Sequence, residues 1–323
     1  MQAAQLMENT GPDGVRATEI PEPESDGTGV VVDLDAAGVS FPDLLQTTGA
    51  YQVVRSLPCV LGTEGAGIVR SAPDGSGVAA GQRVAVLAAD GSWQQTVVVG
   101  PESVFPLPDS VSSTAGAGLL LNYLTVHFAL DERARYRTGD TVLVHGAAGG
   151  VGVAALQLCA ALGLETVAVV STEAKAEVAR ANRATHVVFA ESFKQQTLEV
   201  TDGRGVDIVL DPVGGDRFTD SLRSLAPGGR VVVLGFTGGE IPTVKVNRLL
   251  LKNISVVGAG WGEFIRRDPG YPRRQWDVLA PLLHSGALQV PEPTVYPLAD
   301  AAAALTSLGT RTATGKVALS LRP

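Results

Sequence analysis

The sequence predicts an α/β protein with two domains, a β-rich domain and a doubly wound parallel sheet. Three observations support this prediction. The 323 residues are enough for two hydrophobic cores. The first third of the chain holds short runs of β-branched residues between Gly, Pro and Asp turns. From about residue 123, apolar strands alternate with helices, which is typical of a parallel sheet covered on both faces.

The elements follow from these patterns in chain order. In the β-rich part we expect strands at 29–34, 67–69, 83–87 and 92–99, which suggest a barrel-like domain. The alternating part begins with a strand at 141–145, a helix at 153–162, a strand at 166–171 and a helix from 173 to about 183. Further strands are expected at 187–189, 206–210, 230–234 and 254–257. A helix at 299–307 and a strand at 316–321 could return to the first domain.

The turn between the first strand and helix of the alternating part reads GAAGGVG at 146–152. A side chain at Gly149 or Gly150 would hold the phosphates of a dinucleotide away from the backbone N–H groups, and Gly152 lets helix and strand pack closely. The N-terminus of the helix offers free donors and a positive dipole end. The turn therefore predicts a dinucleotide site. Its expected contacts are Ala148, Gly149, Gly150 and Val151.

Composition excludes several other classes of protein. The net charge of −8, with no cluster of Lys or Arg, argues against nucleic acids and anionic membranes as partners. No run of 18 apolar residues could span a bilayer, and the first residues lack the features of a signal peptide, so a cytoplasmic protein is expected. With only Cys59 and Cys159 present, we expect packing residues and no disulfide framework.

Several motifs, taken in order, cover nearly the whole chain. They are AGVSFPDLLQTTGAY at 37–51, PCVLGTEGAGIV at 58–69, LLNYLTVHFAL at 120–130, the glycine turn, DIVLDPVGG at 207–215, LAPGGRVVVLGFTGG at 225–239, VNRLLLKNISVVG at 246–258 and RTATGKVAL at 311–319. In these motifs the chain resembles the zinc-free, ζ-crystallin-like quinone oxidoreductases of the medium-chain dehydrogenase/reductase superfamily.

The resemblance implies a domain organisation and an oligomeric state. It implies a GroES-like catalytic domain at 1–122, completed by 262–323, and a Rossmann domain at 123–261. It also implies a homodimer that extends the Rossmann sheet through its edge strand, for which 254–257 is the candidate; an internal strand is the alternative.

The resemblance also bears on metal binding. Where the zinc enzymes of the superfamily have a Cys and a His ligand, this chain has Ser40 and Thr63. Hydroxyl groups are poor zinc ligands, and the four cysteines of a structural zinc loop are missing. Glu64 and Asp43 remain but make a poor site on their own, so we expect no metal. Without a Lewis acid, reduction of an electron-poor acceptor fits better than oxidation of an alcohol.

NADPH is the expected cofactor. A carboxylate at the end of the second strand would favour NAD, and this strand ends in Ser171. Lys175 and Arg311 match cations that resemble the family's ligands for the 2′-phosphate. Two departures weaken that match: Arg183 replaces a usual glycine, and Ala190 stands where a tyrosine often packs on the cofactor.

The resemblance implies the remaining site residues. Along the cofactor it implies Thr125, Gly235, Phe236, Thr237 and Asn247, and at the mouth of the substrate pocket Ser40, Asp43 and Tyr51. We expect Tyr51 to orient or protonate a carbonyl oxygen and Ser40 to donate a hydrogen bond, although Tyr51 could simply pack in its loop. The expected activity is reduction of quinones or other α,β-unsaturated carbonyl compounds. The alternatives are a 2-enoyl thioester reductase, with Arg266, Arg267, Arg273 and Arg274 at a basic entrance, and a non-catalytic NADPH-binding protein.

Overall fold

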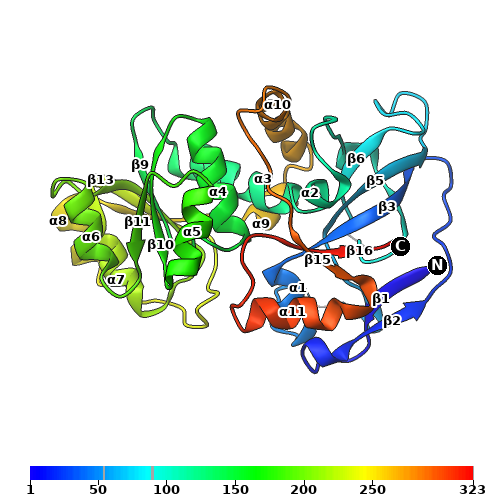
Figure 1. The fold of residues 1–323 in the computed structure, drawn as a ribbon, viewed down its shortest axis with the longest axis horizontal. Coiled ribbons are helices and arrows are strands. Elements are labelled where there is room, and N and C mark those ends of the chain that lie inside the picture. Colours follow the sequence, from blue (N-terminus) through cyan, green and yellow to red (C-terminus); the bar gives the residue numbers. More distant parts are fainter. Residues whose placement is uncertain (54, 89–90, 323) are drawn as a thin grey trace. The chain divides into compact units, whose positions relative to one another are not determined.

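The computed structural model describes residues 1–53, 55–88 and 91–322. These residues form two compact units (Figure 1). Unit 1 comprises Met1–Asn122 and Pro269–Pro323, and unit 2 comprises Tyr123–Asp268. The second boundary lies seven residues later than the expected one after residue 261, because helix α9 (Trp261–Ile265) packs within unit 2. There Phe264 contacts Phe128, with ring centroids 4.9 Å apart.

Unit 1 is built on two β-sheets. The smaller has the order β2-β1-β4, and the larger has the order β15-β16-β3-β5-β6-β8, with β7 also paired to β3. The strands are β1 (Gln2–Leu6), β2 (Val15–Glu19), β3 (Val30–Val39), β4 (Cys59–Val60), β5 (Glu64–Ser71), β6 (Arg83–Leu87), β7 (Thr96–Val99), β8 (Val104–Pro106), β15 (Thr294–Pro297) and β16 (Val317–Ser320). The helices are α1 (Phe41–Thr47), α2 (Ser113–Ala117), α10 (Tyr271–His284) and α11 (Ala301–Gly309).

The C-terminal tail belongs to the larger sheet of unit 1. Strand β16 pairs antiparallel with β3, with Val317 opposite Val39, and β15 pairs parallel with β16. Strand β3 continues to Val39, five residues beyond its expected end, because it carries partners along both edges. This register brings the residue before β16 next to the residue after β3, which matters for the site described below.

The core of unit 1 fills the space enclosed by its sheets. Its largest fully buried side chains include Trp93, Phe105, Leu34 and Leu61. The buried indole of Trp93 keeps a hydrogen-bond partner, since its Nε1 donates to the carbonyl oxygen of Gly38 at 2.9 Å.

Unit 2 is a six-stranded parallel sheet with the order β11-β10-β9-β12-β13-β14. The strands are β9 (Thr141–Val144), β10 (Glu165–Val170), β11 (His186–Phe189), β12 (Val206–Asp211), β13 (Leu225–Val233) and β14 (Ser255–Gly258). All neighbours are parallel, as the alternation of strands and helices predicts. Strand β14 lies at the edge of the sheet within the chain, as expected for 254–257.

Helices cover both faces of this sheet. Helices α4 (Gly150–Ala161) and α5 (Glu173–Ala181) pack on one face, and α6 (Phe193–Val200), α7 (Phe218–Ser224) and α8 (Asn247–Lys252) on the other (Figure 1). Helix α3 (Leu120–Phe128) precedes β9 and continues into a π-helical stretch at Ala129–Ala134. Two expectations were wrong in detail. Helix α4 begins three residues earlier than expected, and Glu165 is the first residue of β10 instead of preceding it.

Two further expectations concern the cysteines and membranes. Cys159 is buried in α4, and Cys59 is half-buried in unit 1; neither forms a disulfide. Burial raises the pKa of the Cys159 thiol to about 12, which suits an unreactive packing residue. In the part of the chain that the structure describes, no helix is long and apolar enough to cross a membrane.

Candidate cofactor and active site

The carboxyl ends of strands β9, β10, β12 and β13 lie side by side at one edge of the parallel sheet. We call the loops that follow these strands the cofactor edge: 145–149 after β9, 171–172 after β10, 212–215 after β12 and 234–239 after β13. From β9 the chain first adds strands β10 and β11 on one side and then β12 to β14 on the other. The direction therefore reverses between β9 and β12, and a parallel sheet binds its ligands at such a switch point.

The glycine turn lies at this switch point and is shaped by close approach. A Cβ on Gly152 would lie 2.2 Å from the carbonyl oxygen of Gly146, so no side chain fits where helix α4 crosses β9. A Cβ on Gly149 would meet only that same oxygen, at 3.4 Å. The protein's own packing therefore requires glycine at 152 but leaves room at 149. That room is what a phosphate group close to the backbone would need.

Helix α4 offers its first N–H groups at the same place. Gly149 is the residue before the helix, and Gly150 and Val151 are its first two residues. All three are half-buried. The N–H groups of a helix's first turn have no partner inside the helix and carry the positive end of its dipole. The early start of α4 brings Gly150 and Val151 into this turn, and their amides suit a pyrophosphate. Ala148 is buried beneath the turn.

The loop after β12 is held by a side chain that the sequence analysis did not assign. The Oδ1 atom of Asp211 accepts hydrogen bonds from the N–H groups of Val213 and Gly214, each at 2.9 Å. The loop after β13 attaches to it: the N–H of Thr237 donates to the oxygen of Pro212 at 3.0 Å. Gly235, Phe236 and Thr237 are thus fixed at the cofactor edge, with Phe236 exposed.

His145, the first residue after β9, packs beneath the loops of the cofactor edge, against residues of helices α6 and α7. It is buried, its Nε2 lies 2.8 Å from the Ser221 Oγ, and its ring meets Phe193 edge-on. Burial lowers the pKa of His145 to about 4, with the nearby Asp211 opposing that shift, so the ring is neutral near pH 7. Neither His145 nor Asp211 stood out in the sequence. The DPVGG motif contained Asp211, and an acidic residue just before Pro and Gly is the available signal.

The loop after β10 carries part of the predicted NADPH selectivity. Ser171 is exposed, and Thr172 caps helix α5 by accepting a hydrogen bond from the Lys175 N–H at 3.3 Å. Lys175 is therefore one turn from Ser171, as expected. Arg183 has a φ of +70°, a left-handed conformation that favours glycine. Arg311 belongs to unit 1, exposed and with a φ of +60°.

Two predicted cofactor contacts lie outside these loops. Thr125 is half-buried on α3, and Asn247 is the exposed first residue of α8. Their roles stay predictions.

In unit 1, four polar side chains form a buried group that we call the Ser40 cluster: Ser40, Asp43, Glu64 and Lys316. The Lys316 Nζ lies 2.5 Å from Glu64 Oε1 and donates to Ser40 Oγ at 2.9 Å. The other oxygen of Glu64 accepts the Leu121 N–H at 2.8 Å. Glu64 is fully buried, and the Lys316 side chain is 10% exposed. The sequence analysis missed Lys316, although its motif RTATGKVAL contains it.

Asp43 holds Ser40 from the other side. Ser40 precedes helix α1, and its backbone N–H donates to Asp43 Oδ2 at 2.8 Å, one half of a capping box. Asp43 is expected at the pocket mouth, and its side chain is completely buried; its role toward a substrate stays a prediction. Burial raises the pKa of Asp43 to about 7; Glu64 adds to this, while the Ser40 and Gly62 amides and Lys316 oppose it. Asp43 holds the backbone of Ser40 in place through this hydrogen bond.

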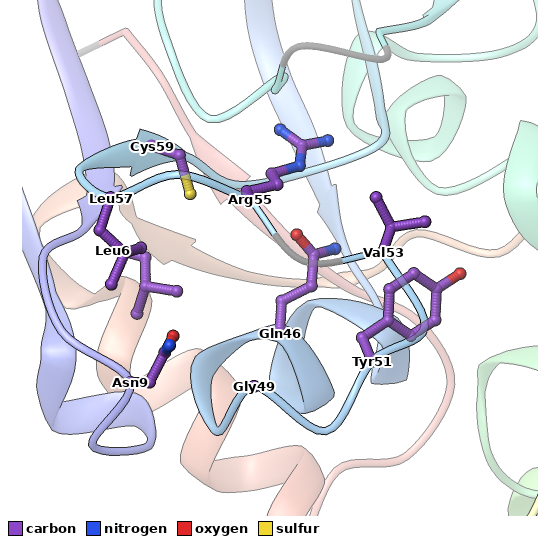
Figure 2. A pocket seen from close by; sticks show the side chains of 9 residues that line it. All are labelled: Leu6, Asn9, Gln46, Gly49, Tyr51, Val53, Arg55, Leu57 and Cys59. Carbon is purple, nitrogen blue, oxygen red and sulfur yellow. The ribbon is translucent and has the colours of Figure 1, made fainter.

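Tyr51 lies in the loop after α1. It lines a small recess with Gln46, Val53, Arg55 and Cys59 among others (Figure 2). In this view its hydroxyl group points away from the recess. A role for Tyr51 toward a substrate stays a prediction.

The place of the family's zinc ion does not suit a metal in this chain. Ser40 offers a hydroxyl, which is a poor zinc ligand, and the Lys316 ammonium already pairs with Glu64. A cation bound there would meet the positive charge of Lys316 at close range. Among the described residues, no three His, Cys, Asp or Glu side chains gather as metal ligands.

Comparisons with known proteins agree with this geometry. Residues 26–130 match the alcohol dehydrogenase GroES-like domain family, and residues 150–280 match the zinc-binding dehydrogenase family. The chain is 34% identical over 297 residues to the bovine quinone oxidoreductase-like protein 2, covering 91% of this chain and 85% of that protein.

Solved structures give the same result. The quinone oxidoreductase of Escherichia coli, solved with NADPH, is 29% identical with a TM-score of 0.88, covering 99% of this chain and all of that one. The CurK enoyl reductase is 25% identical with a TM-score of 0.89, covering 99% and 98%. The GroES-like unit, the parallel Rossmann sheet and these relatives show the family. The chain belongs to the medium-chain dehydrogenase/reductase superfamily of oxidoreductases, among its quinone oxidoreductase-like members.

Proposed function

We propose that this chain is an NADPH-dependent reductase that transfers a hydride to quinones or other α,β-unsaturated carbonyl compounds without zinc. The observation that carries the proposal is the cofactor edge. A turn that leaves room at Gly149 lies at the switch point of a parallel sheet, next to the free amides of α4. The NADPH complex of the Escherichia coli relative supports the same choice of cofactor.

The residues at the end of β10 support a preference for NADPH over NADH. A carboxylate at the end of this strand would repel the 2′-phosphate of NADPH, and this chain has Ser171 there instead. Lys175 follows in the first turn of α5. We propose that Lys175 and Arg311 bind this phosphate and that Thr125 and Asn247 contact the nicotinamide. NADPH, when bound, supplies the hydride. Comparing the Kd values of NADPH and NADH by fluorescence titration tests the selectivity; equal affinities would contradict it.

For the chemical step, the residues needed are few, since the cofactor carries the reaction and the protein aligns it. Hydride transfer leaves negative charge on the carbonyl oxygen of the acceptor. We propose that the Ser40 hydroxyl donates a hydrogen bond to that oxygen and that Asp43 positions Ser40 through its backbone N–H. Tyr51 would orient the carbonyl group or return the proton.

Reduction of 2-enoyl thioesters is the second candidate, supported by the likeness to the CurK enoyl reductase. The arginines that would form its basic entrance are largely engaged elsewhere. Arg273 donates to the carbonyl oxygens of Pro101 and Val104 and lies over Phe105, and Arg266 pairs with Glu263. Arg274 lies over the ring of Tyr271. These contacts favour quinone or enone acceptors over a carrier-bound thioester.

The test is NADPH oxidation, followed by its absorbance, with phenanthrenequinone, an ortho-naphthoquinone, a simple enone and crotonyl thioester. We expect turnover with the quinones or the enone that clearly exceeds turnover with the thioester. Faster turnover of the thioester would replace the proposal with the second candidate. Tight NADPH binding with no turnover of any acceptor would identify a non-catalytic NADPH-binding protein instead.

We also propose that the chain forms a homodimer through the edge of its parallel sheet. Strand β14 is the outermost strand of its sheet among the residues that the structure describes, with Val256 37% exposed. The preceding helix α8 exposes Leu250 and Leu251 by 75% and 80%. Apolar side chains beside an open strand edge favour pairing with a second copy. Light scattering should give twice the mass of one chain, and a monomer at micromolar concentration would contradict this.

A further inference from the structure

A buried ammonium group beside the proposed hydrogen-bond donor is the feature that the function above does not yet use. Lys316 makes two contacts, to Glu64 Oε1 and to Ser40 Oγ. Burying a lysine is costly unless its charge is paired. Glu64 supplies the pairing, so the contact with Ser40 is additional and suggests a purpose beyond neutralising the charge.

The sheet register fixes Lys316 in this position. Val317 pairs with Val39, so Lys316, just before β16, lies opposite Ser40, just after β3. The lysine stem is confined as well, because a Cβ on Gly118 would lie 2.6 Å from Lys316 Cγ. Backbone pairing and this close packing hold the ammonium group against the Ser40 hydroxyl, which leaves little freedom for either side chain.

The hydrogen bond from Lys316 changes what Ser40 can do. It occupies a lone pair of the Ser40 oxygen, so the hydroxyl hydrogen must point elsewhere. Donation from a cation also draws electron density from that oxygen and makes its own O–H a stronger donor. The residue is buried, 7% exposed, so the donating hydroxyl group is largely shielded from bulk water.

We propose that the Lys316 ammonium orients and polarises the Ser40 hydroxyl, which then donates a strengthened hydrogen bond to the carbonyl oxygen of the acceptor. This inference rests on the proposed function. NADPH is oxidised to NADP⁺ as its hydride forms a C–H bond on the acceptor, the electron pair moves onto the carbonyl oxygen, and a proton from solvent completes the reduction. Ser40 breaks no covalent bond. Lys316 is a positioning residue that takes the electrostatic place of a metal ion.

A mutant cycle on the full chain tests the coupling between the two residues. Its members are Ser40→Ala, the double variant Lys316→Met with Glu64→Gln, and the combination of all three changes. Removing both charges together avoids leaving a lone buried charge. Lys194→Met serves as the control, because Lys194 is a half-exposed lysine of unit 2 outside both sites. The readouts are kcat with an enone, NADPH affinity and thermal stability.

We expect Ser40→Ala to lower kcat by about 100-fold, the usual loss for one donor to a developing oxyanion. The double variant should lower kcat by about tenfold, and the combination should be no slower than Ser40→Ala alone, because Lys316 acts only through Ser40. NADPH affinity should stay unchanged in all variants. The control should behave like the wild type.

Two results would overturn the inference. One is a double variant with wild-type kcat, and the other is a loss that multiplies with that of Ser40→Ala. If the double variant does not fold, Lys316→Arg replaces it: this variant keeps a cation and should stay within about fivefold of wild-type kcat. A stable Lys316→Arg as slow as Ser40→Ala would equally contradict the inference. If the wild type oxidises NADPH with none of the acceptors tested, the proposed function itself would be overturned, and the inference with it.

Discussion

The cofactor edge and the Ser40 cluster are built in opposite ways. The cofactor edge consists of backbone groups, and its central turn spans only residues 146–152. The Ser40 cluster consists of side chains, and its contact between Ser40 and Lys316 joins residues 276 positions apart. A backbone site depends on small residues that allow close approach, whereas a side-chain site depends on charge pairing. Substitutions should therefore affect the two regions through different physical causes.

Removing the charge of Lys316 alone should have the largest effect on stability. The change Lys316→Met leaves the Glu64 carboxylate fully buried without its ion-pair partner. Such a loss costs about 3–5 kcal/mol of unfolding free energy. Urea unfolding measures it, with Lys194→Met as the control within about 0.5 kcal/mol of the wild type. A loss below about 1 kcal/mol would mean that this pair is not a buried one.

Adding a methyl group at the glycine turn separates packing from ligand binding. Gly152→Ala should lower the unfolding free energy by about 1–3 kcal/mol, because its Cβ meets backbone at 2.2 Å. Gly149→Ala should leave thermal stability near that of the wild type, since its Cβ has room, but should weaken NADPH binding by about tenfold or more. Calorimetry and fluorescence titration measure the two effects. Unchanged NADPH affinity in Gly149→Ala would contradict the phosphate site.

Asp43 should give the fold a pH dependence opposite in sign to that of the buried His145 at the cofactor edge. Its pKa of about 7 in the folded protein lies above the ordinary value of 3.8 for an aspartate, so the folded state binds the proton more tightly than the unfolded state. The stability that the folded protein gains from protonated Asp43 is fully present below about pH 4 and is lost as the pH rises through 7. Lys316 and Glu64 are the charged groups that face Asp43.

The variant Asp43→Asn keeps an oxygen acceptor for the Ser40 N–H but does not titrate. Relative to the wild type, its stability should rise with pH between 4 and 7, by at most about 1.4 kcal/mol per pH unit. Thermal melting across this range measures the difference. Parallel stability curves for the two proteins would show that Asp43 does not titrate in this window.

Tyr51→Phe should have the smallest effect. Its hydroxyl group points away from the recess that the residue lines (Figure 2). We expect a loss of kcat of a few-fold, well below that of Ser40→Ala. Steady-state rates with the same acceptor decide, and unchanged turnover would remove Tyr51 from the mechanism.

The sequence predicted the parallel sheet and the glycine turn well, because both depend on short-range patterns. The strands β9, β10, β12 and β14 lie where hydrophobic runs predicted them, and β14 lies at the edge of the sheet, as the resemblance implied. The start of α4 was misplaced because glycines mark both a turn and the first residues of a helix. Burial could not be read locally either, so Asp43 was expected at the pocket mouth although it lies in the core.

The Ser40 cluster shows more clearly what could not be predicted from the sequence. Lys316 follows a glycine near the C-terminus, where a lysine is ordinarily a solvated surface charge. Only the pairing of β16 with β3 brings it to Ser40 and Glu64, and no spacing in the sequence encodes that contact. The resemblance pointed to Ser40 through a missing zinc ligand, but the contact of Lys316 with Ser40 is visible only in the three-dimensional structure.

Hydride transfer itself tests the central claim most directly. NADPH carrying deuterium at the transferred position of its nicotinamide ring would be mixed with an enone and the wild-type protein, and the product analysed by mass spectrometry, with both deuterated epimers tried. A reductase should place one deuterium on carbon in the product with one epimer, while NADP⁺ forms in equal amount. A protein that binds NADPH yet yields no deuterated product with either epimer would contradict the account.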